Sequence, residues 1–563
     1  MDADMSMKLL GTLENEKFTF GIEPAARRLA ALQKLGRARL TSAAAVLRLH
    51  ELLCFMRAYP DNQKVLKQCK QIMAAFGQRS DVQRFREELE NSGIAGTAIT
   101  YPFYAATAER LAQRWPQNLS IVWGQYENTA LLDSQLQPMA LWSETPGLDE
   151  MEVGAKKWLN ELRGKQADGA FVARRLAEIY PDAFTFEIIF EQLRLTMQLE
   201  PSHDSPSRTH AAAPVKQTHF QTGPVRAQRP VIAEVLREQP RAIRELSRQE
   251  GQRYVEMARN AMVTRERDLD AFAYADANDV RLVEWEDGLT FVAMGLVPER
   301  RLMLESVYGF LTLRNGVPMG YVLNSALSGS AEIAYNVFDT FRGGEAGWIY
   351  GRVLATVKAL FGVDSFTIYP YQLGHKNNEA LESGAWWFYQ KLGFRPRSTK
   401  VLALMKRELA AMKRTRGHRS SIATLRKLAA ENVYYHEHEQ RDDIICLMKN
   451  DKVGLAVTRM IAKRFGGDRV LAERECHAEA IALLGKPRGR AGGCWFRRWA
   501  PLVTMLPRVA SWSVAERKAL LEVIIKKGSR RESDFVHAFD QHRKLRKAIA
   551  QLSRRLSSAV PGE

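Results

Sequence analysis

AWWFYQKLGFRP, residues 385–396, decides the fold of this chain, together with NNEA at residues 377–380 just before it. The spacing predicts one helix from Asn378, with an apolar face made of Leu381, Ala385, Phe388 and Leu392. Gly393 ends that helix, because glycine tolerates the left-handed conformation of a helix C-terminus. Phe394 then opens an extended segment, and Pro396 prevents the helix from continuing. The stretch predicts an amphipathic helix packed on a sheet.

The residues before this helix indicate the rest of an α/β unit. Asn315-Gly316 is a hairpin turn, because both residues readily take positive φ. The predicted order is strand, strand, strand, glycine loop, helix, strand, helix, strand. Its elements upstream of the helix are strands at 310–313, 319–323 and 331–338, the loop at 342–347, a helix at 349–361 and a strand at 365–369.

The glycine loop indicates a phosphate site. A glycine-rich loop that enters a helix presents free backbone N–H groups and the positive end of the helix dipole. The loop here contains three glycines, Gly343, Gly344 and Gly347, and one cation, Arg342. Such a terminus favours a bound phosphate, whereas the alternative is an ordinary strand-to-helix turn.

Over about residues 305–408 the order of elements and the motifs resemble the GNAT acyltransferase superfamily. The resemblance implies an acyl-CoA or acetyl-CoA co-substrate. It implies that backbone groups of the third strand pair with the pantetheine arm, that the glycine loop holds the pyrophosphate and that the last helix touches the cofactor. By position, these roles fall on Ala334, Tyr335, Asn336 and Val337, on Arg342, Gly343, Gly344 and Gly347, and on Asn377 or Asn378.

Two residues are the predicted catalytic pair. Tyr389 stands where the resemblance places the acid that protonates the leaving thiolate, and a phenol within reach of the sulfur can donate as charge develops. Glu332, on the strand before the glycine loop, is the candidate general base for the acceptor amine. His375 and Glu379 are rival bases. The alternatives are a half-buried aromatic for Tyr389 and a solvent-facing strand carboxylate for Glu332.

Glu345 departs from the family pattern, because it occupies the place of the central glycine of the loop. A carboxylate there would repel a pyrophosphate unless it turns outward or pairs with Arg352.

Length and composition limit the architecture and the compartment. A chain of 563 residues is expected to hold several domains. It has no apolar run long enough for a membrane span and no basic-then-apolar leader. Its five cysteines are widely spaced and predict neither a disulfide framework nor a metal site. A cytoplasmic location is therefore expected.

The predicted organisation is multidomain, α and α/β. A mostly helical domain is expected at residues 1–200, in which His50 is a structural histidine among apolar neighbours. A disordered linker rich in Pro and Ser follows at 201–231, then the GNAT-like mixed-sheet domain at 232–412 and a basic helical domain at 413–563.

The positive charge is concentrated at the end of the chain. Residues 401–563 hold 34 Lys and Arg against 17 Asp and Glu, a net +17 of the whole chain's +18. Clusters lie at 413–419 and at 486–499, where tryptophans stand among arginines. Such a segment attracts RNA, DNA or an anionic lipid surface, and exposed aromatics could stack on bases. The alternative is a solvated basic surface with buried tryptophans.

These observations predict an acyltransferase that moves an acyl group from a thioester, acyl-CoA first among them, to an amine. Two other hypotheses use the same residues. One is a nucleic-acid-binding protein whose GNAT-like domain is inactive. The other is a GNAT-like transferase whose donor is an aminoacyl-tRNA or an acyl carrier protein.

Overall fold

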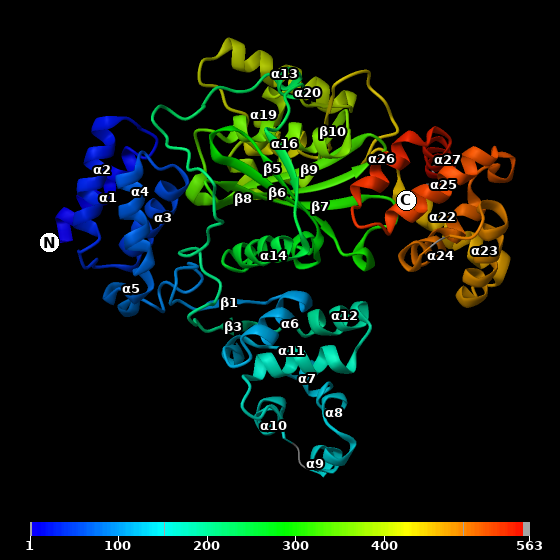
Figure 1. Cartoon of the computed structure of the whole chain (residues 1–563), viewed down its shortest axis with the longest axis horizontal. Helices are drawn as coiled ribbons and strands as arrows, with labels where there is room; N and C mark the ends of the chain where they lie inside the picture. The colour runs from blue at the N-terminus through cyan, green and yellow to red at the C-terminus, as the bar shows by residue number, and fades with distance from the viewer. Residues whose placement is uncertain (1–2, 151–152, 488, 556–563) are drawn as a thin grey trace.

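The computed structural model describes residues 3–150, 153–487 and 489–555. Within them, nine strands form one mixed sheet at the centre of the molecule (Figure 1). The strands are β4 (Ala242–Glu245), β5 (Ala275–Glu284), β6 (Leu289–Leu296), β7 (Ser306–Arg314), β8 (Val317–Leu327), β9 (Ser330–Val337), β10 (Ser365–Ile368), β11 (Arg395–Pro396) and β12 (Val433–His436). Their order is β11-β12-β10-β9-β8-β7-β6-β5-β4. Neighbours pair antiparallel except β9 and β10, which run parallel.

The predicted hairpin is confirmed. β7 and β8 pair antiparallel, and Asn315 and Gly316 between them have φ of 47° and 78°. The third predicted strand is β9, and the strand predicted after the helix is β10. The prediction of a mixed α/β fold with a large sheet is therefore confirmed.

Helices cover both faces of the sheet (Figure 1). On one face lies α14 (Arg248–Val263), whose Gly251 packs against the backbone of Ala277 in β5. On the other lies α16 (Ala346–Phe361), where Thr356 accepts a hydrogen bond from the Trp285 indole. The further helices around the sheet are α13 (Ile232–Val235), α15 (Asp270–Ala273), α17 (Pro370–Leu373), α20 (Thr399–Arg414) and α21 (Ile422–Leu428).

The single helix predicted from Asn378 is wrong, because the chain forms two. They are α18 (Asn378–Glu382) and α19 (Ala385–Lys391). Gly384 between them has φ +67°, a left-handed conformation that interrupts the helical hydrogen bonds. Leu381 and Leu392 are nevertheless both buried, so the predicted apolar positions face the core on either side of the break.

The predicted domain 1–200 contains two differently packed parts. The first five helices share the core of the central sheet: α1 (Ala3–Asn15), α2 (Ile22–Leu35), α3 (Ala43–Ala58), α4 (Gln63–Ala74) and α5 (Ser80–Arg84). Residues 99–199 bury a separate core that includes a three-stranded sheet of order β1-β3-β2, with strands Ile99–Tyr101, Met197–Leu199 and Leu119–Ile121. Its helices are α6 (Ala105–Arg114), α7 (Thr129–Asp133), α8 (Leu136–Met139), α9 (Thr145–Glu150), α10 (Ala155–Leu162), α11 (Asp168–Ile179) and α12 (Ala183–Leu193).

The expectation of a disordered linker at 201–231 is not met. The segment contains no helix or strand within its described length, but a few buried residues and hydrogen bonds fix it against the rest of the chain. Thr209 is fully buried, and its hydroxyl lies 2.9 Å from Nε2 of His50, the histidine expected to be structural. The Ala213 N–H donates to the carbonyl of Gly316 in the β7–β8 turn, at 2.8 Å. Polar composition predicts disorder only where side chains lack partners, and here backbone and buried polar groups supply them.

The predicted boundary at residue 412 divides the central sheet. β12 lies beyond that boundary, yet it pairs with β10 and β11. The helices that follow share the same core: α22 (Asn450–Phe465), α23 (Arg469–Leu484), α24 (Arg490–Met505), α25 (Val514–Lys527), α26 (Ser533–Gln541) and α27 (Arg543–Arg555). The Ser533 N–H donates to the Tyr308 hydroxyl in β7 at 2.9 Å, so the C-terminal helices are anchored on the sheet.

Candidate functional site: a diverging strand pair and a cationic pocket

β9 and β10 separate after a short parallel ladder. They pair only at Ser330, Ala331 and Glu332, whereas β9 continues to pair with β8 as far as Val337. β10 ends at Ile368, and the chain turns into α17. The predicted cofactor-binding residues Ala334, Tyr335, Asn336 and Val337 therefore have a strand neighbour on one side only. Apart from the Val337 carbonyl, which accepts from Arg342 Nε at 3.4 Å, their other side offers peptide groups to a ligand.

Tyr389 lies beside this divergence in a cluster of aromatic rings. Its ring centroid is 5.5 Å from that of Tyr350 and 5.9 Å from that of Phe394. Burial raises the pKa of Tyr389 above its usual value, so the phenol keeps its proton at neutral pH. Tyr335 of β9 joins the cluster, with its ring 5.6 Å from Tyr350.

Two hydroxyls of this aromatic cluster are buried without a hydrogen-bond partner. They are the hydroxyls of Tyr335 and Tyr350, and no described residue forms a hydrogen bond with either one. Buried polar groups in proteins are nearly always hydrogen-bonded, so two unpaired hydroxyls on neighbouring rings indicate a place where a polar ligand group could fit.

Glu332 lies on the other face of β9 from Tyr335, because side chains alternate along a strand. Its Oε2 accepts a hydrogen bond from Cys446 Sγ at 3.0 Å. Burial, together with the nearby Glu305 carboxylate, raises the pKa of Glu332 above its usual value. Glu332 is therefore not the solvent-facing strand carboxylate of the alternative interpretation, because its side chain is largely covered. A carboxylate in such surroundings is a stronger base than an exposed one.

The glycine loop is shaped by contacts within the chain. Arg342 Nη2 lies 2.8 Å from Asp339 and also pairs with Glu379 of α18. Gly343 and Gly344 have φ of +110° and +43°. A Cβ added at Gly344 would lie 2.7 Å from Val225 Cγ2, so the segment before α13 passes close over the loop. Gly347 is likewise near Pro230, 3.6 Å from the position of an added Cβ.

Glu345 neither turns outward nor pairs with Arg352. It is 3% exposed, lies 3.4 Å from Arg314 Nη1 and accepts a 3.0 Å hydrogen bond from the Tyr59 hydroxyl. Arg352 pairs instead with Glu238 and Glu286. The charge that would repel a phosphate is thus held inside the protein against an arginine.

The polar residues of the predicted last helix have local roles. Asn377 is the N-cap of α18: its Oδ1 accepts from the Ala380 N–H at 3.1 Å and its Nδ2 donates to the Tyr371 carbonyl at 3.2 Å. Asn378 and His375 are exposed, and Glu379 is the partner of Arg342. Asn377 and Glu379 therefore contact Tyr371 and Arg342, the second of which belongs to the glycine loop.

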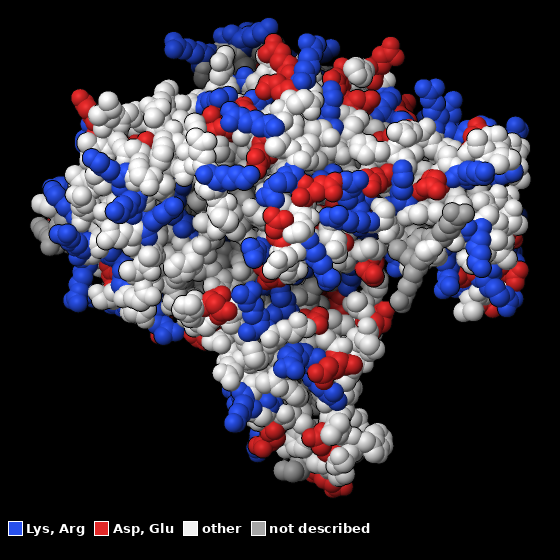
Figure 2. All heavy atoms as spheres, in the orientation of Figure 1, with Lys and Arg blue, Asp and Glu red and all other residues white. Residues whose placement is uncertain are grey.

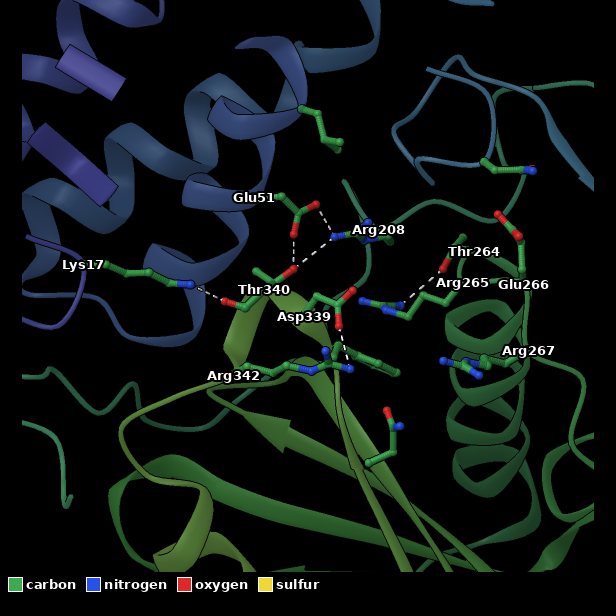
Figure 3. Close-up of a pocket in the computed structure, with 14 residues that line it drawn as sticks. Lys17, Glu51, Arg208, Thr264, Arg265, Glu266, Arg267, Asp339, Thr340 and Arg342 are labelled. Atoms are coloured by element: carbon green, nitrogen blue, oxygen red, sulfur yellow. Dashed lines mark hydrogen bonds and ion pairs between the residues drawn. The ribbon is translucent and has the colours of Figure 1, made fainter. Parts of the chain in front are cut away.

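A cationic pocket of about 500 Å³ lies at the end of β9 (Figure 3). It unites segments that are far apart in sequence, and two predicted residues, Asn336 and Arg342, line it. Its charged lining residues are Lys17, Glu51, Arg208, Arg265, Glu266, Arg267, Asp339 and Arg342. Figure 3 shows Lys17 entering from one side and Arg267 from the other, with Arg208, Arg265 and Arg342 between them.

Sequence reasoning missed most of this pocket and the contact between Cys446 and Glu332. Arg265-Glu266-Arg267 is a visible charge run directly after a helix, and it could have been noted as a surface cluster. Nothing in the sequence connects it with Lys17 or Arg208, because tertiary packing alone brings those segments together.

The basic C-terminal third offers no exposed tryptophan platform within its described residues. Trp495 and Trp499 are 2% and 0% exposed, so they belong to the core and cannot stack on bases. Arg488 of the second basic cluster lies outside the described residues. On the face drawn in Figure 2, basic and acidic side chains are mixed over the middle of the molecule, whereas basic side chains predominate at its left and right sides. The tryptophans of this region are therefore core residues, and a polyanionic partner for its positive charge stays a prediction.

Comparison with known proteins gives no match: neither protein-family models nor curated proteins nor solved structures resemble the chain significantly. In the parts of the chain that the structure describes, no helix has both the length and the apolar character needed to cross a bilayer.

Proposed function

We propose that this protein is an acyltransferase that moves an acyl group from a thioester donor, acyl-CoA in the first instance, to an amine. The observation that carries the proposal is the divergence of β9 from β10 beside Tyr389. A strand whose peptide groups lack a partner on one side can bind an extended amide-containing arm as a strand binds its neighbour. The arm of a pantetheine thioester contains two such amides.

The donor would lie along Ala334–Val337 with its sulfur toward Tyr389. The unpaired hydroxyls of Tyr335 and Tyr350 support this placement, since a polar arm in the cleft would give them hydrogen-bond partners. The burial of Glu345 against Arg314 supports it as well, because it removes the negative charge from the loop beside the cleft.

The proposed reaction uses one proton acceptor and one proton donor. Glu332, with its raised pKa, takes a proton from the acceptor amine, directly or through water, and the neutral amine attacks the thioester carbonyl. A backbone N–H near Val337 stabilises the oxyanion of the tetrahedral intermediate. The C–S bond then breaks, the amide forms, and Tyr389 gives its proton to the leaving thiolate.

The alternative donors remain part of the proposal. An acyl carrier protein carries the same pantetheine arm, whereas an aminoacyl-tRNA does not. The net charge of +17 over residues 401–563 favours a polyanionic donor, either an acidic carrier protein or a tRNA. A purely nucleic-acid-binding protein is less favoured, because the buried Trp495 and Trp499 offer no stacking surface.

Titration calorimetry of the full chain with acetyl-CoA and long-chain acyl-CoA tests the donor. We expect binding, and we expect Arg342→Ala to weaken it by about 1.5–3 kcal/mol, the value of a charge-assisted hydrogen bond. Arg416→Ala removes the same charge from an exposed loop outside the site and serves as the control. Absence of binding to every acyl-CoA would reject coenzyme A as donor and leave the carrier and tRNA versions to be tested with those molecules.

A further inference from the structure

Three cations that line the pocket at the end of β9 have no carboxylate partner. Among the described residues, no acidic oxygen lies within 4 Å of the charged groups of Lys17, Arg265 or Arg267. Each comes from a different position around the cavity, and Figure 3 shows their side chains directed toward its interior. Unpaired cations that share one cavity repel each other and are stabilised by an anion between them.

Two of these cations are fixed in place by neutral groups. Lys17 Nζ donates to the Thr340 carbonyl at 2.6 Å. Arg265 donates to the Ala261 carbonyl at 3.0 Å, and its guanidinium lies 3.7 Å from the Phe338 ring centroid. Burial lowers the pKa of both side chains, in Arg265 with a contribution from Arg208. The Glu51 carboxylate acts in the opposite direction on both pKa values without forming an ion pair with either side chain. Partly desolvated charges that have no ion-pair partner interact strongly with a bound anion.

The acidic residues of the pocket do not neutralise this charge. Glu51 pairs with Arg208, and Asp339 pairs with Arg342. Glu266 is the remaining acidic side chain of the lining, against the three unpaired cations. Five cations and three carboxylates leave the pocket with a net charge of +2.

We propose that this pocket binds a small, multiply charged anion of the phosphate-ester or diphosphate class. Arginine guanidinium groups match the geometry of phosphate oxygens, and four of the five cations are arginines. A volume of about 500 Å³ lies in the range of small-ligand sites and exceeds what a single chloride needs. Such a ligand is distinct from the acyl group that is transferred, although Asn336 and Arg342 line this pocket and also belong to the proposed donor site.

Calorimetric titration of the full chain with inorganic pyrophosphate tests this directly, with ADP as a second probe. We expect saturable binding that weakens as salt rises. Arg267→Ala should weaken it at least tenfold, and Arg265→Ala should weaken it at least as much. Arg416→Ala, which makes the same change of net charge on an exposed loop, should change the affinity less than twofold.

The melting temperature of each variant separates binding from folding. Arg265→Ala also removes the contact between Arg265 and the Phe338 ring, so this variant could lower the melting temperature. Arg267 has no such ring contact among the described residues, and Arg267→Ala is therefore the variant expected to keep the native melting temperature. Tighter binding of ADP than of pyrophosphate would assign the site to a nucleotide, and equal binding would assign it to the diphosphate group alone. Undetectable binding of both probes at millimolar concentration, or equal affinity in Arg267→Ala and Arg416→Ala, would overturn the proposal. Arg342 lines this pocket and also belongs to the proposed donor site, so Arg265→Ala and Arg267→Ala, which lie outside that donor site, decide this test separately from acyl transfer.

Discussion

Glu345 and Arg314 form a buried ion pair, 3.4 Å apart, with exposed fractions of 3% and 1%. The pair joins the N-cap residue of α16, which belongs to the glycine loop, to the last residue of β7. It explains how a carboxylate can occupy a position in the loop where an open phosphate site would exclude one. The pair therefore stabilises the folded loop and is not exposed on the outer surface of the loop, where a ligand would bind.

Breaking this pair should destabilise the protein strongly. We expect Glu345→Gln to lower the free energy of unfolding by about 3–5 kcal/mol, because Arg314 is then left buried without a counter-charge. Urea unfolding of the wild type and the variant measures this change in the free energy of unfolding. Glu200→Gln, which breaks the exposed pair with Arg86 at 3.2 Å, should cost less than about 1 kcal/mol. An equal cost for the two variants would contradict the role assigned to burial.

Gly344→Ala should also destabilise the fold, by about 1–2 kcal/mol. The residue has φ +43°, and the new Cβ would lie 2.7 Å from Val225 Cγ2. Gly11→Ala is the matched control. Gly11 sits inside α1 with nothing within 4 Å of an added Cβ, so alanine there should raise stability by about 0.5–1 kcal/mol. Both changes are measurable by thermal unfolding, and a neutral or stabilising Gly344→Ala would show that the loop can relax.

Much of the central fold could be predicted from the sequence. The Asn-Gly turn, the order of β7, β8 and β9 and the strand after α16 follow from local signals that tertiary contacts did not override. The break at Gly384 was missed because Leu381, Ala385 and Phe388 keep helical spacing across it. The place of β12 in the sheet was missed because its partner β10 lies far away in sequence, and pairing over such a distance leaves no local signal.

The candidate site was predictable only in part. The places of Tyr389 and of the strand Ala334–Val337 in the fold follow from local signals, because each stands at a fixed position relative to a glycine or a strand end, whereas their roles stay predictions. The disordered-linker prediction failed for a different reason: Thr209 is buried by contacts with His50 and Ala95, which composition cannot reveal. The same contacts bring Arg208 to the cationic pocket.

Removing the Tyr335 hydroxyl should separate stability from binding. The buried hydroxyl has no partner among the described residues, so Tyr335→Phe should leave the free energy of unfolding unchanged or raise it by about 1 kcal/mol. If the thioester arm supplies the missing partner, the same variant should bind the donor several-fold more weakly. Paired urea unfolding and calorimetry make the comparison. A clear loss of stability with unchanged donor affinity would place the hydroxyl in the fold and not in the site.

Activity should depend on pH through Glu332. Burial raises the pKa of this carboxyl, and the protonated form cannot accept a proton, so the rate should fall as pH drops through a value above 4.5. Glu332→Gln should abolish this dependence and lower the rate. Glu305→Gln removes a neighbouring negative charge, which lowers the pKa of Glu332 and should shift the acidic limb of the rate profile to lower pH. A limb that stays in place in Glu332→Gln would assign the base to another residue, with His375 and Glu379 as the next to test.

The most direct test of acyl transfer is the release of free coenzyme A from acyl-CoA in the presence of a mixture of amines, with mass spectrometry of the acylated product. The account predicts one thiol released for each amide formed, and a rate about 10²-fold lower in Tyr389→Phe with donor affinity unchanged, because a positioned acid is lost and the ring is kept. Protein-dependent transfer at the same rate in Tyr389→Phe, or binding of acyl-CoA without transfer to any amine, would contradict it.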